Sequence, residues 1–103
     1  MRKIESNMCR AVANRNNWAN SNTQVTISAE TNDANVYLHG NHIATVSNNE
    51  ITLFDGGWQS VTTKSRLNAL LETFTGLGRG LYQRNYEWFV QSNNNPFYNG
   101  MTV

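Results

Sequence analysis

The stretch VYLHGNHIATV, residues 36–46, predicts a β-hairpin at the centre of the fold. Gly40 and Asn41 both tolerate positive φ, which favours a two-residue turn between two strands. This turn predicts that His39 lies directly opposite His42. An antiparallel sheet built outward from this hairpin is therefore expected.

Alternation along the two strands separates the faces of the predicted sheet. Val36, Leu38 and Ile43 share one face, which we expect to lie in the core. Tyr37 shares the opposite face with the two histidines. A histidine pair could begin a zinc site, but no cysteine or carboxylate lies close enough in the sequence to complete it. A solvated hairpin end is the better interpretation, and no metal is expected.

Helices and further strands are predicted on both sides of the hairpin. The hydrophobic period of 3.6 predicts a helix over residues 2–16 and a second one that begins at the N-cap Thr62 and is ended by Gly76 and Gly78. The period of two predicts strands over residues 24–30, 35–39, 42–46, 50–54, 82–91 and 97–103, with a short helix as the alternative for 82–91. The expected fold class is α+β: an N-terminal helix, an antiparallel sheet of four to six strands, and a second helix packed on one face.

Length and composition narrow the class of protein. The chain has 103 residues, enough for one domain, and its formal net charge of +1 does not suggest a bulk nucleic-acid binder. No apolar run is long enough to predict a membrane span. The lone Cys9 cannot form an internal disulfide, which fits a reducing compartment. We expect a soluble intracellular domain.

Motifs for catalysis are missing from the sequence. There is no G-x-S-x-G turn and no phosphate-binding glycine motif after a strand, and the carboxylates are scattered along the chain. A small hydrolase or nuclease would require clustering that the sequence does not reveal. We therefore expect a binding protein without a cofactor, and no enzyme.

The start of the second predicted helix carries unusual chemistry. Acidic residues are favoured in a first helical turn, but this one has Lys64 and Arg66, with hydroxyls on Thr62, Thr63 and Ser65. Free N–H groups, hydroxyls and cations could together bind a phosphate or carboxylate. The alternative is a capped helix whose basic side chains point into water.

Aromatic and basic residues alternate in the last third of the chain. On a single strand, Tyr82, Arg84, Tyr86 and Trp88 would share one face. If exposed, that face would suit a protein partner or stacked bases. The alternative is that these side chains fill the core of a small domain.

Three stretches, residues 36–44, 57–71 and 82–89, resemble small accessory proteins of tailed bacteriophages. The shared features are a tryptophan, here Trp58, a Thr-Thr pair at 62–63 and an Arg-Leu-Asn-Ala-Leu helix start at 66–70. The resemblance covers most of the chain beyond residue 15. It implies a setting in the host cytoplasm and a role in binding and disabling a host enzyme or defence complex, CRISPR machinery included.

Two functional hypotheses follow. The first is a non-catalytic inhibitor or adaptor that binds a host protein or nucleoprotein complex through the second helix start and the aromatic face. The second is a nucleic-acid-binding module that uses the same helix start, since the predicted element order is also that of double-stranded-RNA-binding domains, although their lysine-rich motif is absent. An exposed strand edge would permit a homodimer as well as a monomer. The candidate binding residues are Thr62, Thr63, Lys64, Arg66, Arg84, Tyr86 and Trp88.

Overall fold

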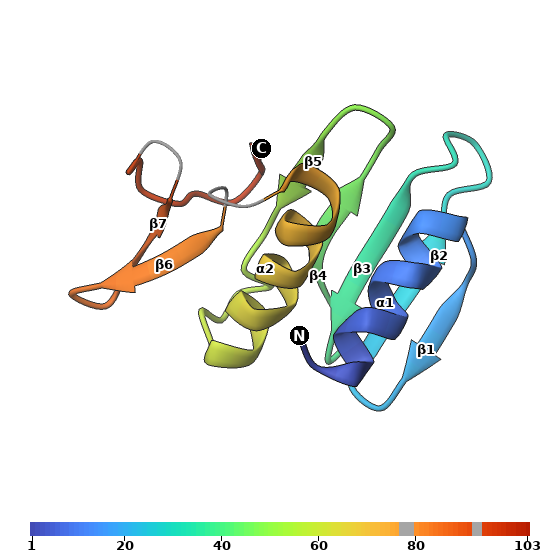
Figure 1. Cartoon of the computed structure of the whole chain (residues 1–103), viewed down its shortest axis with the longest axis horizontal. Coiled ribbons are helices and arrows are strands. Elements are labelled where there is room, and N and C mark those ends of the chain that lie inside the picture. Colours follow the sequence, from blue (N-terminus) through green and yellow to red (C-terminus); the bar gives the residue numbers. More distant parts are fainter. Residues whose placement is uncertain (77–79, 92–93) are drawn as a thin grey trace.

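The structure is a computed structural model that describes residues 1–76, 80–91 and 94–103. Its elements in chain order are α1 (Lys3–Asn14), β1 (Trp18–Asn20), β2 (Thr23–Ile27), β3 (Ala34–Leu38), β4 (Asn41–Val46), β5 (Ile51–Leu53), α2 (Val61–Thr75), β6 (Leu81–Arg84), β7 (Glu87–Val90) and β8 (Met101–Thr102). The strands form a six-stranded antiparallel sheet of order β1-β2-β3-β4-β5-β8 and a separate β6–β7 hairpin (Figure 1). The predicted α+β class is confirmed.

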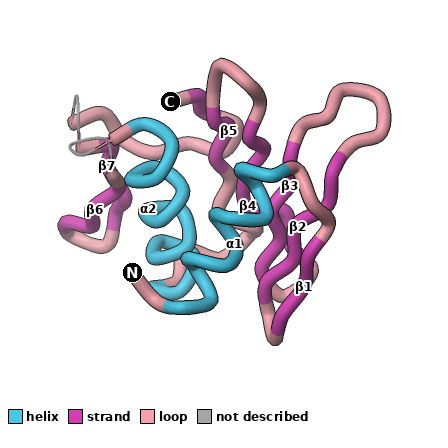
Figure 2. Tube along the Cα trace, turned by 45° about the vertical axis from the view of Figure 1, so that its right-hand side comes forward, coloured by secondary structure: helices cyan, strands magenta, loops and turns pink. Residues whose placement is uncertain are grey.

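Both helices cover the same face of the large sheet, and the other face is left uncovered (Figures 1 and 2). The core lies between these two layers. Val36, Leu38 and Ile43 are buried there, as their alternation predicts. The largest fully buried core side chains are Met8, Val12, Val25, Val36, Ile43, Leu53, Leu67, Leu70, Leu71 and Val90.

The central hairpin turns one residue earlier than predicted. His39 and Gly40 occupy the turn with φ of 52° and 77°, and Leu38 pairs with Asn41. The prediction that His39 lies opposite His42 is wrong, because His39 itself adopts the left-handed conformation. A β-bulge then shifts the register between Val36 and Tyr37, so that Val36 pairs with Ala44, and Ile43 and Ala44 are both buried.

Helix boundaries also differ from the periodic pattern. α1 ends at Asn14, before the left-handed Arg15, and the short edge strand β1 follows it unpredicted. The N-cap of α2 is Ser60, whose Oγ accepts a hydrogen bond from the Thr63 N–H at 3.0 Å. The prediction of Thr62 as N-cap is therefore wrong by two residues. Gly78 lies outside the described residues.

The predicted strand over residues 82–91 is two strands. Asn85 and Tyr86 form the turn between β6 and β7, with φ of 52° and 66°. Arg84 and Tyr86 therefore do not share a face with Trp88 along one strand, because the chain reverses between them. Trp88 instead points into the core, where its ring meets Phe97 edge-on at 5.3 Å between centroids.

The β6–β7 hairpin is fastened to α2 by one amide side chain. Asn68 Nδ2 donates to the Leu81 carbonyl at 3.1 Å, and the Leu81 N–H donates to Asn68 Oδ1 at 2.6 Å. The Asn68 amide thus bonds the N–H and the carbonyl of Leu81 as a neighbouring strand would, and it attaches β6 to α2. The hairpin projects beyond the end of the large sheet (Figure 1). Among the described residues, no helix combines the length and the apolar character that crossing a membrane requires.

Candidate partner-binding surface

Arg66, a predicted binding residue, is buried between the two helices and the sheet. Its side chain is 4% exposed and forms an ion pair with Glu5 of α1, with 2.8 Å between Nη1 and Oε2. Its Nε also donates to Thr23 Oγ1 at 3.0 Å, and its Nη2 donates to Asn22 Oδ1 at 3.3 Å. The guanidinium is thus engaged on all sides with its own fold.

The other half of the ion pair is equally engaged. Ser65 Oγ donates to Glu5 Oε2 at 2.6 Å, and the Arg2 N–H donates to Glu5 Oε1 at 3.3 Å. Burial alone raises the pKa of the Glu5 carboxyl, but hydrogen bonds from Ser65, Arg66 and Arg2 outweigh burial and lower it. Glu5 therefore stays ionised at neutral pH. We call Glu5, Asn22, Thr23, Ser65 and Arg66 the buried network.

The remaining predicted residues at the start of α2 differ in their exposure to solvent. Thr63 is buried, and its hydroxyl lies 2.8 Å from Ser60 Oγ. Thr62 and Lys64 are half-buried. Of the five residues expected to bind an anion together, Thr63 and Arg66 are buried, and the half-buried Ser65 donates its hydroxyl to Glu5.

Large apolar side chains are exposed at the start of α2. Trp58 is 74% exposed and Val61 is 69% exposed. The loop that carries Trp58 is held by Asp55, whose Oδ1 accepts from the Gly57 N–H at 2.8 Å and whose carbonyl accepts from the Trp58 N–H at 3.3 Å. The tryptophan is therefore presented by an ordered turn.

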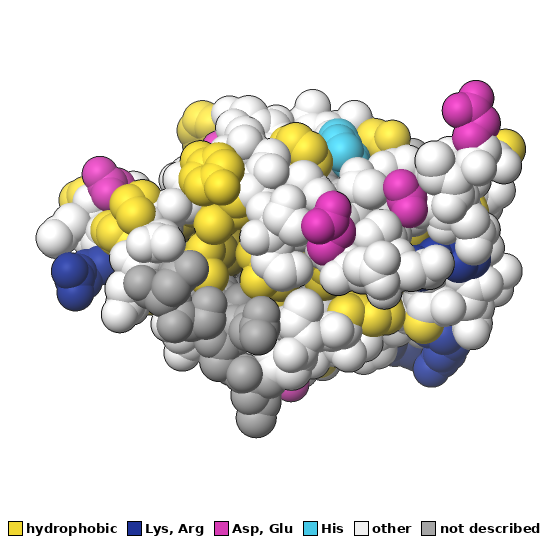
Figure 3. Space-filling model, turned by 90° about the horizontal axis from the view of Figure 1, so that it is seen from above, with side chains coloured by type: hydrophobic (Ala, Val, Ile, Leu, Met, Phe, Trp, Pro, Cys, Tyr) yellow, Lys and Arg dark blue, Asp and Glu magenta, His cyan; other side chains and the backbone are white. Residues whose placement is uncertain are grey.

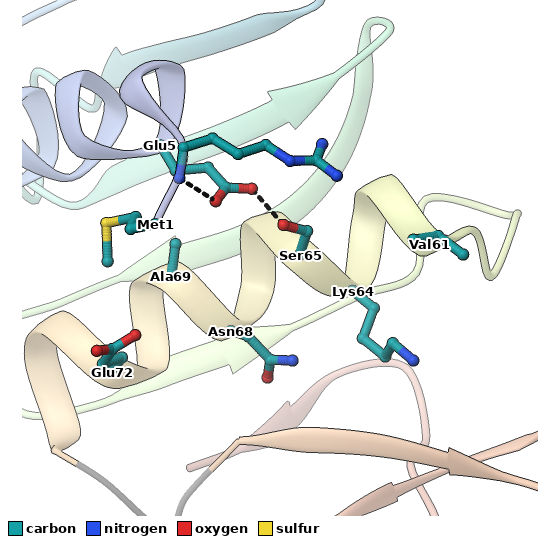
Figure 4. Close-up of a pocket in the computed structure, with 9 residues that line it drawn as sticks. Met1, Glu5, Val61, Lys64, Ser65, Asn68, Ala69 and Glu72 are labelled. Carbon is teal, nitrogen blue, oxygen red and sulfur yellow. Dashed lines mark hydrogen bonds between the residues drawn. The ribbon is translucent and has the colours of Figure 1, made fainter.

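A groove of about 360 Å³ runs between the first residues of the chain and α2. Figure 4 shows Glu5 and Ser65 pointing toward each other across it, and Lys64 and Asn68 pointing away from α1. Trp58 lines a neighbouring groove of about 280 Å³ together with the β3–β4 turn. We call five residues around these two grooves the α2-start surface: the exposed Met1, Arg2, Trp58 and Val61, and the half-buried Lys64.

The β6–β7 hairpin separates the other three predicted residues. Tyr86 in the turn is 93% exposed, whereas Trp88 is 3% exposed. Arg84 is exposed, and its guanidinium carbon lies 5.9 Å from the centre of the Phe89 ring. Two of the three predicted residues are thus available to a partner.

Sequence reasoning missed Glu5, although a signal was present. Glu5 lies at i, i+3 and i+7 with Met8 and Val12, so the helical pattern places a carboxylate on the apolar stripe of α1. Arg66 likewise falls on the buried stripe of α2 with Leu70. A charge on such a stripe requires a buried partner of opposite sign.

Potential ligands for metals are dispersed. No group of three or more His, Cys, Asp or Glu side chains comes together among the residues that the structure describes. Cys9 is buried, and burial raises the pKa of its thiol. Its sulfur accepts a hydrogen bond from the Thr73 hydroxyl at 3.4 Å.

Comparison with known proteins gives one match. A family model described as Kyanoviridae Gp96 protein matches residues 1–103. No curated protein and no solved structure matches the chain.

Proposed function

The chain belongs to the Kyanoviridae Gp96 family of bacteriophage proteins, and from this premise we propose that it is a non-catalytic protein that binds a host protein or nucleoprotein complex in the host cytoplasm. Binding inhibits or redirects that target, as in anti-defence proteins, of which anti-CRISPR proteins are one type. The α2-start surface is the docking site. Arg84 and Tyr86 at the tip of the β6–β7 hairpin are a secondary contact.

The exposure of Trp58 carries the proposal. A tryptophan in water leaves a large apolar area hydrated, and such side chains are frequent hot spots of protein interfaces. Val61 is a second exposed apolar side chain, one helical turn before Lys64 on the same side of α2. Arg2 and Lys64 line the groove together with the exposed Glu72, and the two cations suit a target that presents apolar groups next to carboxylates.

Nucleic-acid binding is the alternative. The buried network removes Arg66 from the predicted phosphate site and leaves Lys64 and Thr62 at the surface. Such a site would have few phosphate contacts, and because each contact adds about one to the slope of log affinity against log salt, its affinity would fall modestly but measurably as salt rises. Salt dependence therefore separates the alternative from an apolar protein interface.

The test is an affinity pull-down from host lysate with and without nuclease. Trp58→Ala and Lys64→Ala probe the α2-start surface, and Tyr98→Ala is the matched control, because Tyr98 is another aromatic residue with 63% exposure. Arg66→Ala is unsuitable as a binding variant because it would disturb folding. Circular dichroism of each variant checks that the fold is retained.

Each outcome has a defined meaning. Recovery of a specific host protein that survives nuclease, is lost with Trp58→Ala and is kept with Tyr98→Ala supports the proposal. Recovery that disappears with nuclease, with salt and with Lys64→Ala supports the nucleic-acid alternative. Failure to recover either component with the folded protein contradicts both.

A further inference from the structure

Among the residues that the structure describes, the uncovered face of the large sheet carries no Asp, Glu, Lys or Arg. Strand registers place the outward side chains of β1 to β5 and β8 on this face, which we call the open sheet face: Ala19, Gln24, Thr26, Asn35, Tyr37, His42, Thr45, Thr52, Phe54 and Thr102. A solvated protein surface normally has about a quarter to a third of its residues charged. The lack of charge over a whole sheet face is typical of the centre of an interface.

The centre of this face is ordered by side-chain contacts. The His42 ring lies 5.4 Å from Tyr37 and 4.6 Å from Phe54, measured between centroids. Thr45 Oγ1 donates to Asn35 Oδ1 at 2.7 Å and lies 2.8 Å from His42 Nε2. Since the hydroxyl proton is directed to Asn35, the His42 Nε2–H donates to Thr45. These contacts fix the rotamers before any partner arrives, which lowers the entropic cost of binding.

The polar groups of the open sheet face can form hydrogen bonds with the same groups on a second copy of the face. Threonine hydroxyls and the amides of Asn35 and Gln24 each contain a donor and an acceptor. In a two-fold dimer the same patch meets itself, so every residue must tolerate a copy of its own surroundings. An uncharged face with paired donors and acceptors meets this condition, whereas a face with one sign of charge does not.

The rim of the face has a different character. Glu30 and Asp33 lie in the loop after β2, and Glu50 precedes β5. Figure 3 shows the molecule from above, with acidic side chains spread along this side and Lys and Arg near the two extremes of the long axis. Phosphates would be repelled by this rim, which argues against nucleic acid as the occupant.

We propose that the open sheet face binds the same face of a second copy of this chain. Strands about 4.8 Å apart that rise about 3.3 Å per residue give a face of roughly 25 by 15 Å. That projected area is below the roughly 800 Å² per partner of a standard interface, so we expect a weak and reversible dimer. The α2-start surface lies on the helical side and stays free in this dimer (Figure 2).

The test uses the purified protein alone, by sedimentation velocity across the micromolar range. The wild type is expected to shift from the 11.7 kDa chain mass to twice that mass. Thr52→Lys and Gln24→Lys each place a charge on both sides of the interface and should raise the dissociation constant at least tenfold. Asn14→Lys is the matched control, since it adds the same charge to the exposed end of α1.

Salt provides an independent readout. Screening weakens repulsion between the acidic rims, so the dimer should tighten as salt rises. A wild type that stays monomeric throughout, folded sheet-face variants that dimerise as well as the wild type, or a control that dissociates equally would overturn the proposal. Because no host component is present, these results are separate from those of the pull-down.

Discussion

Lys64 and Arg66 stand two residues apart in α2, yet the structure uses them in opposite ways. Arg66 lies on the buried stripe and joins α2 to α1 and β2, whereas Lys64 lines the surface groove. Trp88 and Tyr86 repeat the contrast in the β6–β7 hairpin, with one residue in the core and the other in the turn. Basic and aromatic residues that look equivalent in a sequence motif can therefore divide between folding and binding.

The largest effect is expected from Arg66→Ala. Removal of the guanidinium leaves the Glu5 carboxylate buried without its cation, which should cost about 3–5 kcal/mol of unfolding free energy. Urea unfolding followed by circular dichroism measures this loss. Lys64→Ala should change the same quantity by less than about 0.5 kcal/mol. Equal losses of unfolding free energy in the two variants would show that Lys64 and Arg66 do not differ in their contribution to folding.

A double variant sharpens the same contrast. Glu5→Met combined with Arg66→Met removes both charges, so its stability should lie well above that expected from adding the two single losses. Additive losses would show that the two side chains act independently and that the ion pair contributes little.

Trp88→Ala should have the next largest effect. It removes a core side chain that packs against Phe97 and should lower the free energy of unfolding by about 3 kcal/mol. Tyr86→Ala in the turn should be nearly neutral in the same urea titration, since its side chain is exposed. A large loss for Tyr86→Ala would mean that the turn residue packs against the fold.

Acid should weaken the buried network selectively. The folded pKa of Glu5 lies below its value of 4.5 in the unfolded chain, so its contribution is complete above that pH and is lost as pH falls through the folded pKa. Urea midpoints at a series of pH values below 5 should therefore decline more steeply for the wild type than for Glu5→Gln. Parallel curves would exclude Glu5 as a source of acid sensitivity.

Asn68→Ala is expected to have the smallest measurable effect on stability. It removes both bonds to Leu81 near a partly hydrated site, at a cost of about 1 kcal/mol. Hydrogen exchange of the amides in β6 and β7 should accelerate while the core strands remain protected. Uniform acceleration in all strands would show that the hairpin is not a separate unit.

Local patterns predicted much of this fold and little of the site. Alternation in residues 36–46 correctly placed Val36, Leu38 and Ile43 in the core, and the hydrophobic period of 3.6 correctly predicted the helix α2. Both patterns depend only on residues that are close together in the sequence. The turn register was not predictable from glycine alone, since His39 also adopts positive φ. Asn85 and Tyr86 reverse the chain for the same reason, so one strand became two.

The burial of Arg66 depends on contacts far apart in the sequence. Its partners Thr23 and Glu5 belong to other elements, and no local rule connects them to α2. The exposure of Trp58 is equally a tertiary property, because a tryptophan near a helix start can pack against the helix as easily as face solvent. The sequence could identify residues with suitable chemistry, but only the packed structure separates those that bind from those that fold.

The ion pair between Glu5 and Arg66 also constrains the order in which the elements pack while the chain is being synthesised. The two residues are 61 positions apart, so the first helix leaves the ribosome with a carboxylate on its apolar stripe and no cation to meet it. The nascent chain can order its hairpins early, since these contacts are local. Docking of α1 must wait for α2, and β5 waits still longer for its edge partner β8. Folding is thus expected to be cooperative, because the contact of α1 with α2 and the pairing of β5 with β8 both join segments that lie far apart in the chain.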